Sequence, residues 1–292
     1  MTPAFPRPSS WQLRTRQLPL PNAGQPPLLM GIVNVTPDSF SDGGRHADIE
    51  AAVAHGLQLA AAGADILDVG GESTRPFADP VAADDEWQRV GEVVRRLTEE
   101  SGLPVSIDTA KAVVAERAIA AGAEIINDVT GLEGDPAMAE LARATGAGVC
   151  AMHMQGTPQT MQLDPRYDDV VVEIHAYLRQ RRDALLAAGI PPAAICLDPG
   201  IGFGKTHQHN LQLMQNAGRF LDLGCPILVG HSRKGFLGKL VEQVQGREPA
   251  IADRDLATAA TACSLAAQGI QVIRVHDVAT VRLALVAFSA TA

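Results

Sequence analysis

Polar and charged side chains recur at one kind of position in this sequence, directly after short apolar runs. A single Asp or Asn in such a position is often only the N-cap of the next helix. Repetition after eight successive runs favours a shared site, because the carboxyl ends of parallel strands in a barrel meet at one mouth. The positions are Asn34, 72–75, Asp108, Asn127, His153, Asp198, 231–234 and 274–277.

Basic residues within this set predict a site for an anion. Arg233 and Lys234 follow the seventh run, and Arg274 and His276 follow the eighth. Phosphate sites in barrels are frequent at these two strands. Arg75, in the segment GESTRP after the second run, is a further candidate, since a planar guanidinium can bind a phosphate through two nitrogens.

The loop after the first run contains candidate ligands for a metal ion. The segment NVTPDSFSDGG (34–44) carries Asn34, Asp38 and Asp42. These are hard oxygen ligands, and Mg²⁺ favours a few protein oxygens together with substrate phosphates. A flexible, turn-rich loop is the minimal interpretation of the same segment.

Three further strand-end residues predict a flat, polar, heterocyclic ligand. Asp108, Asn127 and Asp198 end the third, fourth and sixth runs, and their carboxylate and amide groups can bind ring donors and acceptors. Lys234 adds a donor for a ring carbonyl or nitrogen. Buried polar groups are costly without partners, so these side chains indicate a ligand that completes them.

The segment DPGIGFGKT (198–206) resembles a nucleotide-binding loop only in its Gly-Lys-Thr ending. A Walker A motif requires glycine where Pro199 stands, so the spacing excludes it. The glycines instead permit close approach of the backbone to a ligand, and Phe203 is available to stack on it.

The elements that must position these residues alternate regularly along the chain. Amphipathic segments such as 46–63, 110–122 and 168–190 separate the apolar runs and are predicted to be helices. Eight strand–helix units predict a single-domain α/β fold, a (β/α)₈ TIM barrel over 28–292, with 1–27 as a partly irregular extension. An open doubly wound sheet is the alternative. The predicted strands are 28–34, 65–71, 103–108, 124–129, 148–153, 194–199, 226–231 and 271–276.

Composition restricts the class of protein. A formal net charge of −9 argues against a nucleic-acid-binding or anionic-membrane surface. The four cysteines show no metal-binding spacing and indicate a reducing compartment. No signal-peptide pattern opens the sequence. The uncharged stretch 256–273 is better interpreted as a helix followed by a strand than as a membrane span. We therefore expect a soluble, cytoplasmic protein with no membrane partner.

Taken together, these motifs resemble the dihydropteroate synthase family from about Met30 to Asp277. Each is weak alone, but their order and their positions at strand ends are specific. The segments are MGIVNVTPDSFSDGG, DVGGESTRP, SIDT, INDVTG, MHMQGTP, LDPGIGFGKT, SRKG and RVHD.

The resemblance implies an enzyme that condenses 6-hydroxymethyl-7,8-dihydropterin diphosphate with 4-aminobenzoate and releases pyrophosphate. It implies Mg²⁺ as cofactor with Asn34 as ligand, and a homodimer. Asp108, Asp38, Arg75 and Lys234 would act in catalysis, with Asp108 stabilising a cationic pterin and Asp198 as a further candidate for that role. The substrate-binding residues would be Phe40, Thr74, Arg75, Asp108, Asn127, Met152, Asp198, Phe203, Lys234, Arg274 and His276.

Two positions depart from the family pattern, and two alternatives stay open. Phe77 stands where the family often has Gly, and Gly235 stands where many members have a Ser near the aminobenzoate carboxylate. A pterin-binding methyltransferase barrel would share the heterocycle site but would not need the Arg274 and His276 cluster. A catalytically silent pterin-binding paralogue would be expected to have lost loop residues that are present here, such as Asn34.

Overall fold

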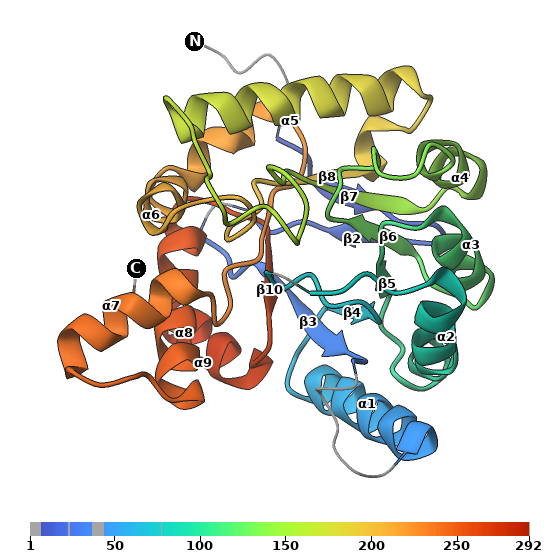
Figure 1. Cartoon of the computed structure of the whole chain (residues 1–292), viewed down its shortest axis with the longest axis horizontal. Coiled ribbons are helices and arrows are strands. Elements are labelled where there is room, and N and C mark those ends of the chain that lie inside the picture. The colour runs from blue at the N-terminus through green and yellow to red at the C-terminus, as the bar shows by residue number, and fades with distance from the viewer. Residues whose placement is uncertain (1–6, 23, 37–43, 77, 292) are drawn as a thin grey trace.

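The computed structural model describes residues 7–22, 24–36, 44–76 and 78–291. Parallel strands occupy the middle of the molecule and helices surround them (Figure 1). All eight predicted strands are confirmed, seven of them with nearly the expected bounds, whereas only 228–229 of the predicted 226–231 form a strand. They are β3 (Leu28–Asn34), β4 (Ile66–Gly70), β5 (Val105–Asp108), β6 (Ile125–Asp128), β7 (Gly148–Met152), β8 (Ile195–Asp198), β9 (Leu228–Val229) and β10 (Val272–Val275).

The sheet closes on itself. Its strands follow the order β8-β7-β6-β5-β4-β3-β10-β9. The two ends meet in a parallel bridge between Leu197 and Ile227, beside which the Leu197 N–H donates to the carbonyl of Pro226 at 2.9 Å. The fold is therefore the predicted (β/α)₈ barrel and not an open sheet.

Helices cover the outside of the barrel through their apolar faces. In α2, for example, Val90, Val93, Val94 and Leu97 are all buried at three- and four-residue steps. The predicted helical segments correspond to α1, α3 and α5. The helices are α1 (Gly44–Ala61), α2 (Ala83–Glu100), α3 (Ala112–Ala120), α4 (Met138–Thr145), α5 (Val170–Ala187), α6 (His207–Gln215), α7 (Gly235–Gln245), α8 (Ile251–Ala267) and α9 (Val278–Ser289), with short 3₁₀ turns η2 (Pro192–Ala194) and η3 (Ala217–Leu223). Among these described helices, none is both long and apolar enough to cross a bilayer.

The amino-terminal segment is more regular than its sequence suggests. β1 (Ser10–Gln12) and β2 (Gln17–Pro19) pair as an antiparallel hairpin. Trp11 and Leu13 are fully buried, and the Trp11 Nε1–H donates to the carbonyl of Ala194 at 3.0 Å. The hairpin thus packs against the end of the barrel where the strands begin.

Inside the barrel, the side chains nearest this hairpin are apolar. They form one buried cluster in which Trp11, Leu13 and Leu20 pack under residues of seven strands. Because its members are buried and apolar, this layer serves packing and offers no polar group to a ligand. The strand residues in it are Met30, Ile66, Ile125, Cys150, Cys196, Leu228 and Val272.

Candidate active site

A ring of mostly polar side chains lies directly above the apolar layer. Side chains alternate between the two faces of a strand, so residues two positions further along also point into the barrel. Five of the predicted site residues, each at the last or next-to-last position of its strand, fall in this ring. Its members are Ile32, Asp68, Asp108, Asn127, Met152, Asp198, Gly230 and Arg274.

Arg274 joins two carboxylates of the ring. Its Nε donates to Oδ2 of Asp68 at 2.5 Å, and its Nη2 donates to Oδ2 of Asp108 at 2.6 Å. Burial raises the pKa of the Asp108 carboxyl to about 7, although the charge of Arg274 opposes that rise. One guanidinium cannot neutralise both carboxylates when both are ionised, so this side of the ring suits a ligand that becomes positively charged.

Lys234 lies beside the ring, close to Asp198 and to the loop that follows β8. The Lys234 ammonium donates to the carbonyl of Ile201 at 2.5 Å and lies 4.0 Å from the centroid of the Phe203 ring. Asp198 accepts from the Gly200 N–H at 2.6 Å. Burial raises the pKa of Asp198 to about 6 and lowers the pKa of Lys234 to about 7, so both groups titrate near neutrality.

The glycines of the loop after β8 allow this close packing. Gly202 has a φ of +85°, and a Cβ there would lie 2.5 Å from Cδ of Lys234. A side chain at this position would therefore push Lys234 away from Phe203.

Lys205 attaches the same loop to His153, the residue after β7. It is 2% exposed, and its ammonium meets three acceptors: the Phe203 carbonyl at 2.7 Å, His153 Nδ1 at 3.0 Å and the His153 carbonyl at 3.5 Å. Burial lowers the pKa of His153 to about 3, so its ring is a neutral acceptor. Lys205, the lysine of the Gly-Lys-Thr sequence, thus links the end of β7 to the loop that carries Phe203.

Asn34 and His276 lie beyond the ring, at the ends of the adjacent strands β3 and β10. The Ser232 hydroxyl oxygen accepts the His276 backbone N–H at 3.2 Å and lies 3.0 Å from its Nδ1. In the tautomer in which Ser232 donates to Nδ1, the neutral ring carries its hydrogen on Nε2, where it can bind an anion. Burial and the charge of Arg233 lower the pKa of His276 to about 3.

Two residues of the strand-end set serve the scaffold. Arg233 forms a two-point ion pair with Asp255 of α8, at 2.6 and 2.8 Å. The Asp277 side chain accepts from the Thr280 N–H at 3.0 Å and caps α9. The Arg233 guanidinium is therefore held by α8, although its charge still acts on His276, and Asp277 is the N-cap of the next helix.

The loop after β4 borders a cavity of about 250 Å³. Thr74, Asp79 and Asp108 are among its lining residues, and Arg75 is exposed nearby in the chain. Glu72 links the two ends of this loop and α3, because its carboxylate accepts from the Val81 N–H at 2.8 Å and from Lys111 at 2.6 Å. Lys111 is bonded in turn to the fully buried Glu86 at 2.6 Å.

Some predicted residues fall outside the described part of the chain. These are Asp38, Phe40 and Asp42 in the first loop, and Phe77 in the second. Within residues 7–22, 24–36, 44–76 and 78–291, no cluster of three or more His, Cys, Asp or Glu is arranged to hold a metal ion.

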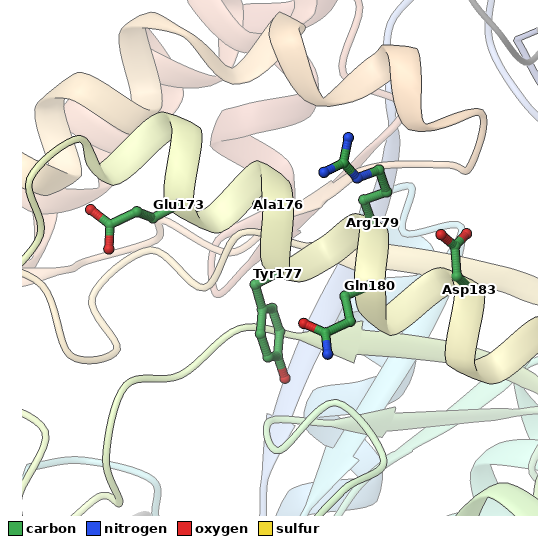
Figure 2. Close-up of a pocket in the computed structure, with 6 residues that line it drawn as sticks. All are labelled: Glu173, Ala176, Tyr177, Arg179, Gln180 and Asp183. Atoms are coloured by element: carbon green, nitrogen blue, oxygen red, sulfur yellow. The ribbon is translucent and has the colours of Figure 1, made fainter.

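A larger hollow, of about 610 Å³, lies outside the barrel (Figure 2). All of its lining residues belong to the single helix α5, among them Glu173, Tyr177 and Asp183. The Tyr177 hydroxyl is already bonded to Glu133 at 3.0 Å. A surface lined by one helix has no converging polar groups from several strands, so the barrel mouth is the better candidate site.

Known proteins share this arrangement. A family model described as "Pterin binding enzyme" matches residues 30–276. A dihydropteroate synthase of Neisseria meningitidis serogroup C is 46% identical over 267 residues, which cover 90% of this chain and 92% of that one. The chain belongs to the dihydropteroate synthase family of pterin-binding enzymes.

Solved structures of this family have the same fold. A Xanthomonas albilineans dihydropteroate synthase with 4-aminobenzoic acid is 44% identical, with a TM-score of 0.87, over 96% of this chain and 98% of that one. A structure from the same organism in complex with 7,8-dihydropteroate is 42% identical, with a TM-score of 0.83 and the same coverage.

Against this family pattern, the departure at Gly235 is not imposed by packing. Gly235 is the first residue of α7, and a Cβ built on it would meet nothing nearer than Cε1 of His207 at 4.0 Å. A serine would therefore fit at this position of the dihydropteroate synthase scaffold.

Sequence reasoning missed Asp68 and Lys205. Asp68 lies in mid-strand, whereas the prediction considered strand ends. The signal that could have found it is the alternation of β4, because Ile66 faces inward and Asp68 stands two residues later. Nothing in the local sequence distinguishes the buried Lys205 from a surface lysine.

Proposed function

We propose that the chain is a dihydropteroate synthase, joining 6-hydroxymethyl-7,8-dihydropterin diphosphate to 4-aminobenzoate with release of pyrophosphate. The observation that carries this proposal is the ring at the barrel mouth, where Asp108, Asn127 and Asp198 converge with Lys234 and Arg274. Family membership supports the same reaction.

The chemistry needs charge stabilisation more than a nucleophile. The bond between the pterin methylene carbon and the diphosphate oxygen breaks, the aminobenzoate nitrogen bonds to that carbon, and the nitrogen then loses a proton. An electron-rich pterin ring shares the positive charge that develops at the methylene. Ionised Asp108, with Asp198 as a further candidate, would stabilise that cation across the ring.

The departing diphosphate would bind near the ends of β3 and β10. Arg274 uses two of its five N–H groups on Asp68 and Asp108, so three stay available for phosphate oxygens. His276 would donate from Nε2, and Thr74 and Arg75 would approach from the loop after β4. Arg274 would therefore bind the two carboxylates and the diphosphate at the same time.

A magnesium ion fits the donor set at this end. Asn34 provides one hard oxygen donor at the end of β3, and Mg²⁺ commonly binds through few protein oxygens and substrate phosphates. Bound there, the ion would neutralise charge that develops on pyrophosphate. Asn34 would be its ligand, and Asp38, which is expected to act in catalysis, lies outside the described residues.

Aminobenzoate would approach beside Phe203 and Lys234. The exposed part of the Phe203 ring offers a stacking surface, and Lys234 is held against it. Phe40 is expected to flank the same ligand, and Met152 to line the pterin pocket beneath. Lys234 would also donate to the pterin ring.

A homodimer is the assembly that the surface supports. Of the nine exposed large hydrophobic residues in the described chain, six lie on α7, α8 and α9, which are neighbours in Figure 1. An apolar face of this kind is characteristic of an interface, and a second copy would cover it with matching residues. The six are Leu240, Val244, Ile251, Leu256, Leu283 and Val286.

A cytoplasmic location is also proposed, since all four cysteines are free thiols. The function itself is tested by pyrophosphate release from dihydropterin diphosphate with Mg²⁺, with and without 4-aminobenzoate. Release that depends on aminobenzoate and yields dihydropteroate would support the synthase. Pterin binding without such release would favour the methyltransferase-type or silent-paralogue alternatives.

A further inference from the structure

Asp68 is a fully buried carboxylate in the middle of β4. Its Oδ2 accepts from Arg274 Nε at 2.5 Å and from Asn127 Nδ2 at 3.1 Å. Its Oδ1 is equally buried and has no hydrogen-bond partner in the described part of the protein. The side chain thus contacts two predicted ligand-binding residues and lies too deep to be readily reached by a substrate itself.

This arrangement is poor for stability. A buried charge is costly even when paired, and apolar residues of similar size are often neutral or stabilising in its place. The unpartnered Oδ1 adds to that cost. The neighbouring inward positions one layer below are apolar, such as Ile66 of the same strand, so the barrel can be filled without a carboxylate here.

The contacts of Asp68 define the orientation of both partners. By accepting from Asn127 Nδ2, it turns the Asn127 amide so that Oδ1 is the atom left for a ligand. By accepting from Arg274 Nε, it holds the guanidinium at a second point, whereas Asp108 alone binds only Nη2. With one point of attachment the guanidinium could swing about that bond.

We propose that Asp68 is a positioning residue, which orients Asn127 and Arg274 for the pterin diphosphate and does not itself contact the substrate. The proposal rests on the function proposed above. It assigns to Asp68 the alignment of the pterin side of the site, while the aminobenzoate side, built on Phe203 and Lys234, is independent of it.

The test compares Asp68→Asn with the wild-type protein and with a control, Ser106→Ala. Ser106 is also fully buried and is the register partner of Asp68 on the neighbouring strand β5, but its hydroxyl makes no hydrogen bond to a site residue in the described part of the protein. Steady-state kinetics with each substrate varied separately, calorimetric binding of pterin diphosphate and thermal unfolding are measured on all three proteins.

We expect Asp68→Asn to raise the KM for pterin diphosphate and weaken its binding by about tenfold or more, as misplaced site groups do. The KM for aminobenzoate and the unfolding midpoint should be unchanged, or the midpoint higher. Ser106→Ala should match the wild type in kinetics. If the isosteric variant folds poorly, Asp68→Ser is measured with the same readouts.

An Asp68→Asn protein with wild-type affinity for pterin diphosphate would overturn the inference. A lower unfolding midpoint together with a raised KM for both substrates would also overturn it, because a merely structural role predicts that pattern. The wild-type assay separates the two proposals, since absence of aminobenzoate-dependent turnover in the wild type would refute the synthase function, whatever the variants do.

Discussion

The Nη2 atom of Arg274 lies 2.6 Å from Oδ2 of Asp108, across a barrel in which β4 and β3 separate their two strands. The pair links the residue expected to stabilise a pterin cation with a residue expected to bind the departing anion. Because the two side chains are in contact, the charge that develops on the pterin affects the group that binds the diphosphate.

Replacing Asp108 by Asn should reduce kcat by about 100-fold, the scale observed when one preorganised electrostatic group is removed. The side chain keeps its size, and Arg274 keeps its bond to Asp68, so the fold and aminobenzoate KM should change little. Steady-state kinetics and a thermal melt check both points. An unchanged kcat would refute the charge-stabilising role.

Activity should follow a bell-shaped pH profile centred near neutrality. The pKa of Asp108 is raised by burial to about 7, so its stabilising charge is lost as the pH falls below that value. The pKa of Lys234 is lowered by burial to about 7, so its proton is lost as the pH rises. Measuring kcat/KM from about pH 5 to 9 tests this expectation.

The variant Lys234→Arg serves as the control for the alkaline limb. Arginine stays protonated throughout this range, so activity, although lower, should no longer decline on the alkaline side. Persistence of the same alkaline limb would assign it to another group.

Removal of the Asn34 side-chain amide should weaken the response to magnesium. We expect Asn34→Ala to need about tenfold more Mg²⁺ for half-maximal activity, the scale on which metal sites respond to lost coordination support. Asn216→Ala, at the end of α6, is the control and should keep the wild-type titration curve. Equal curves for all three proteins would exclude Asn34 as ligand.

Adding a hydroxyl at Gly235 should improve aminobenzoate binding. The space beside Gly235 accepts a side chain, and a hydroxyl bonded to a carboxylate lowers the binding free energy by about 1.5 kcal/mol, or roughly tenfold in affinity. The KM for aminobenzoate should therefore fall in Gly235→Ser. Gly235→Ala separates this from the helix-stabilising effect of losing a glycine, and an equal fall in both variants would contradict the hydroxyl contact.

A charge on the apolar face of α7 to α9 should disrupt the homodimer. Leu283 on α9 is 73% exposed, and we expect Leu283→Asp to shift the sedimentation mass from two chains to one. Leu163→Asp is a matched control, because Leu163 is 69% exposed but lies elsewhere, between β7 and α5. Identical masses for wild type and Leu283→Asp would argue against this interface.

Much of the barrel could be read from local pattern. Runs such as 28–34 and 148–153 are apolar up to their last residue, as strands buried on both faces are, and they form β3 and β7. The hairpin at Trp11 was harder to foresee, since its strands have three residues each and owe their order to packing on the barrel end. Such short strands are not stable by themselves in water.

The sequence predicts which residues lie at the candidate site but not which side chains contact one another there. Polar residues at strand ends were enough to indicate one mouth, which is why Asp108, Asn127 and Asp198 were expected together. The sequence could not say that Arg233 turns to Asp255, nor that Lys205 is buried against His153. Each of these pairings joins elements that are remote along the chain.

By itself the sequence determined the number of barrel strands and the chemistry collected at their carboxyl ends, because apolar runs and strand-end polarity are local properties. Only the tertiary structure decided which charges meet. Arg274 and Asp108 are 166 residues apart, and barrel closure and strand register bring them together. The pKa of Asp108 depends on that closure as well, since it is burial within the assembled ring that raises it.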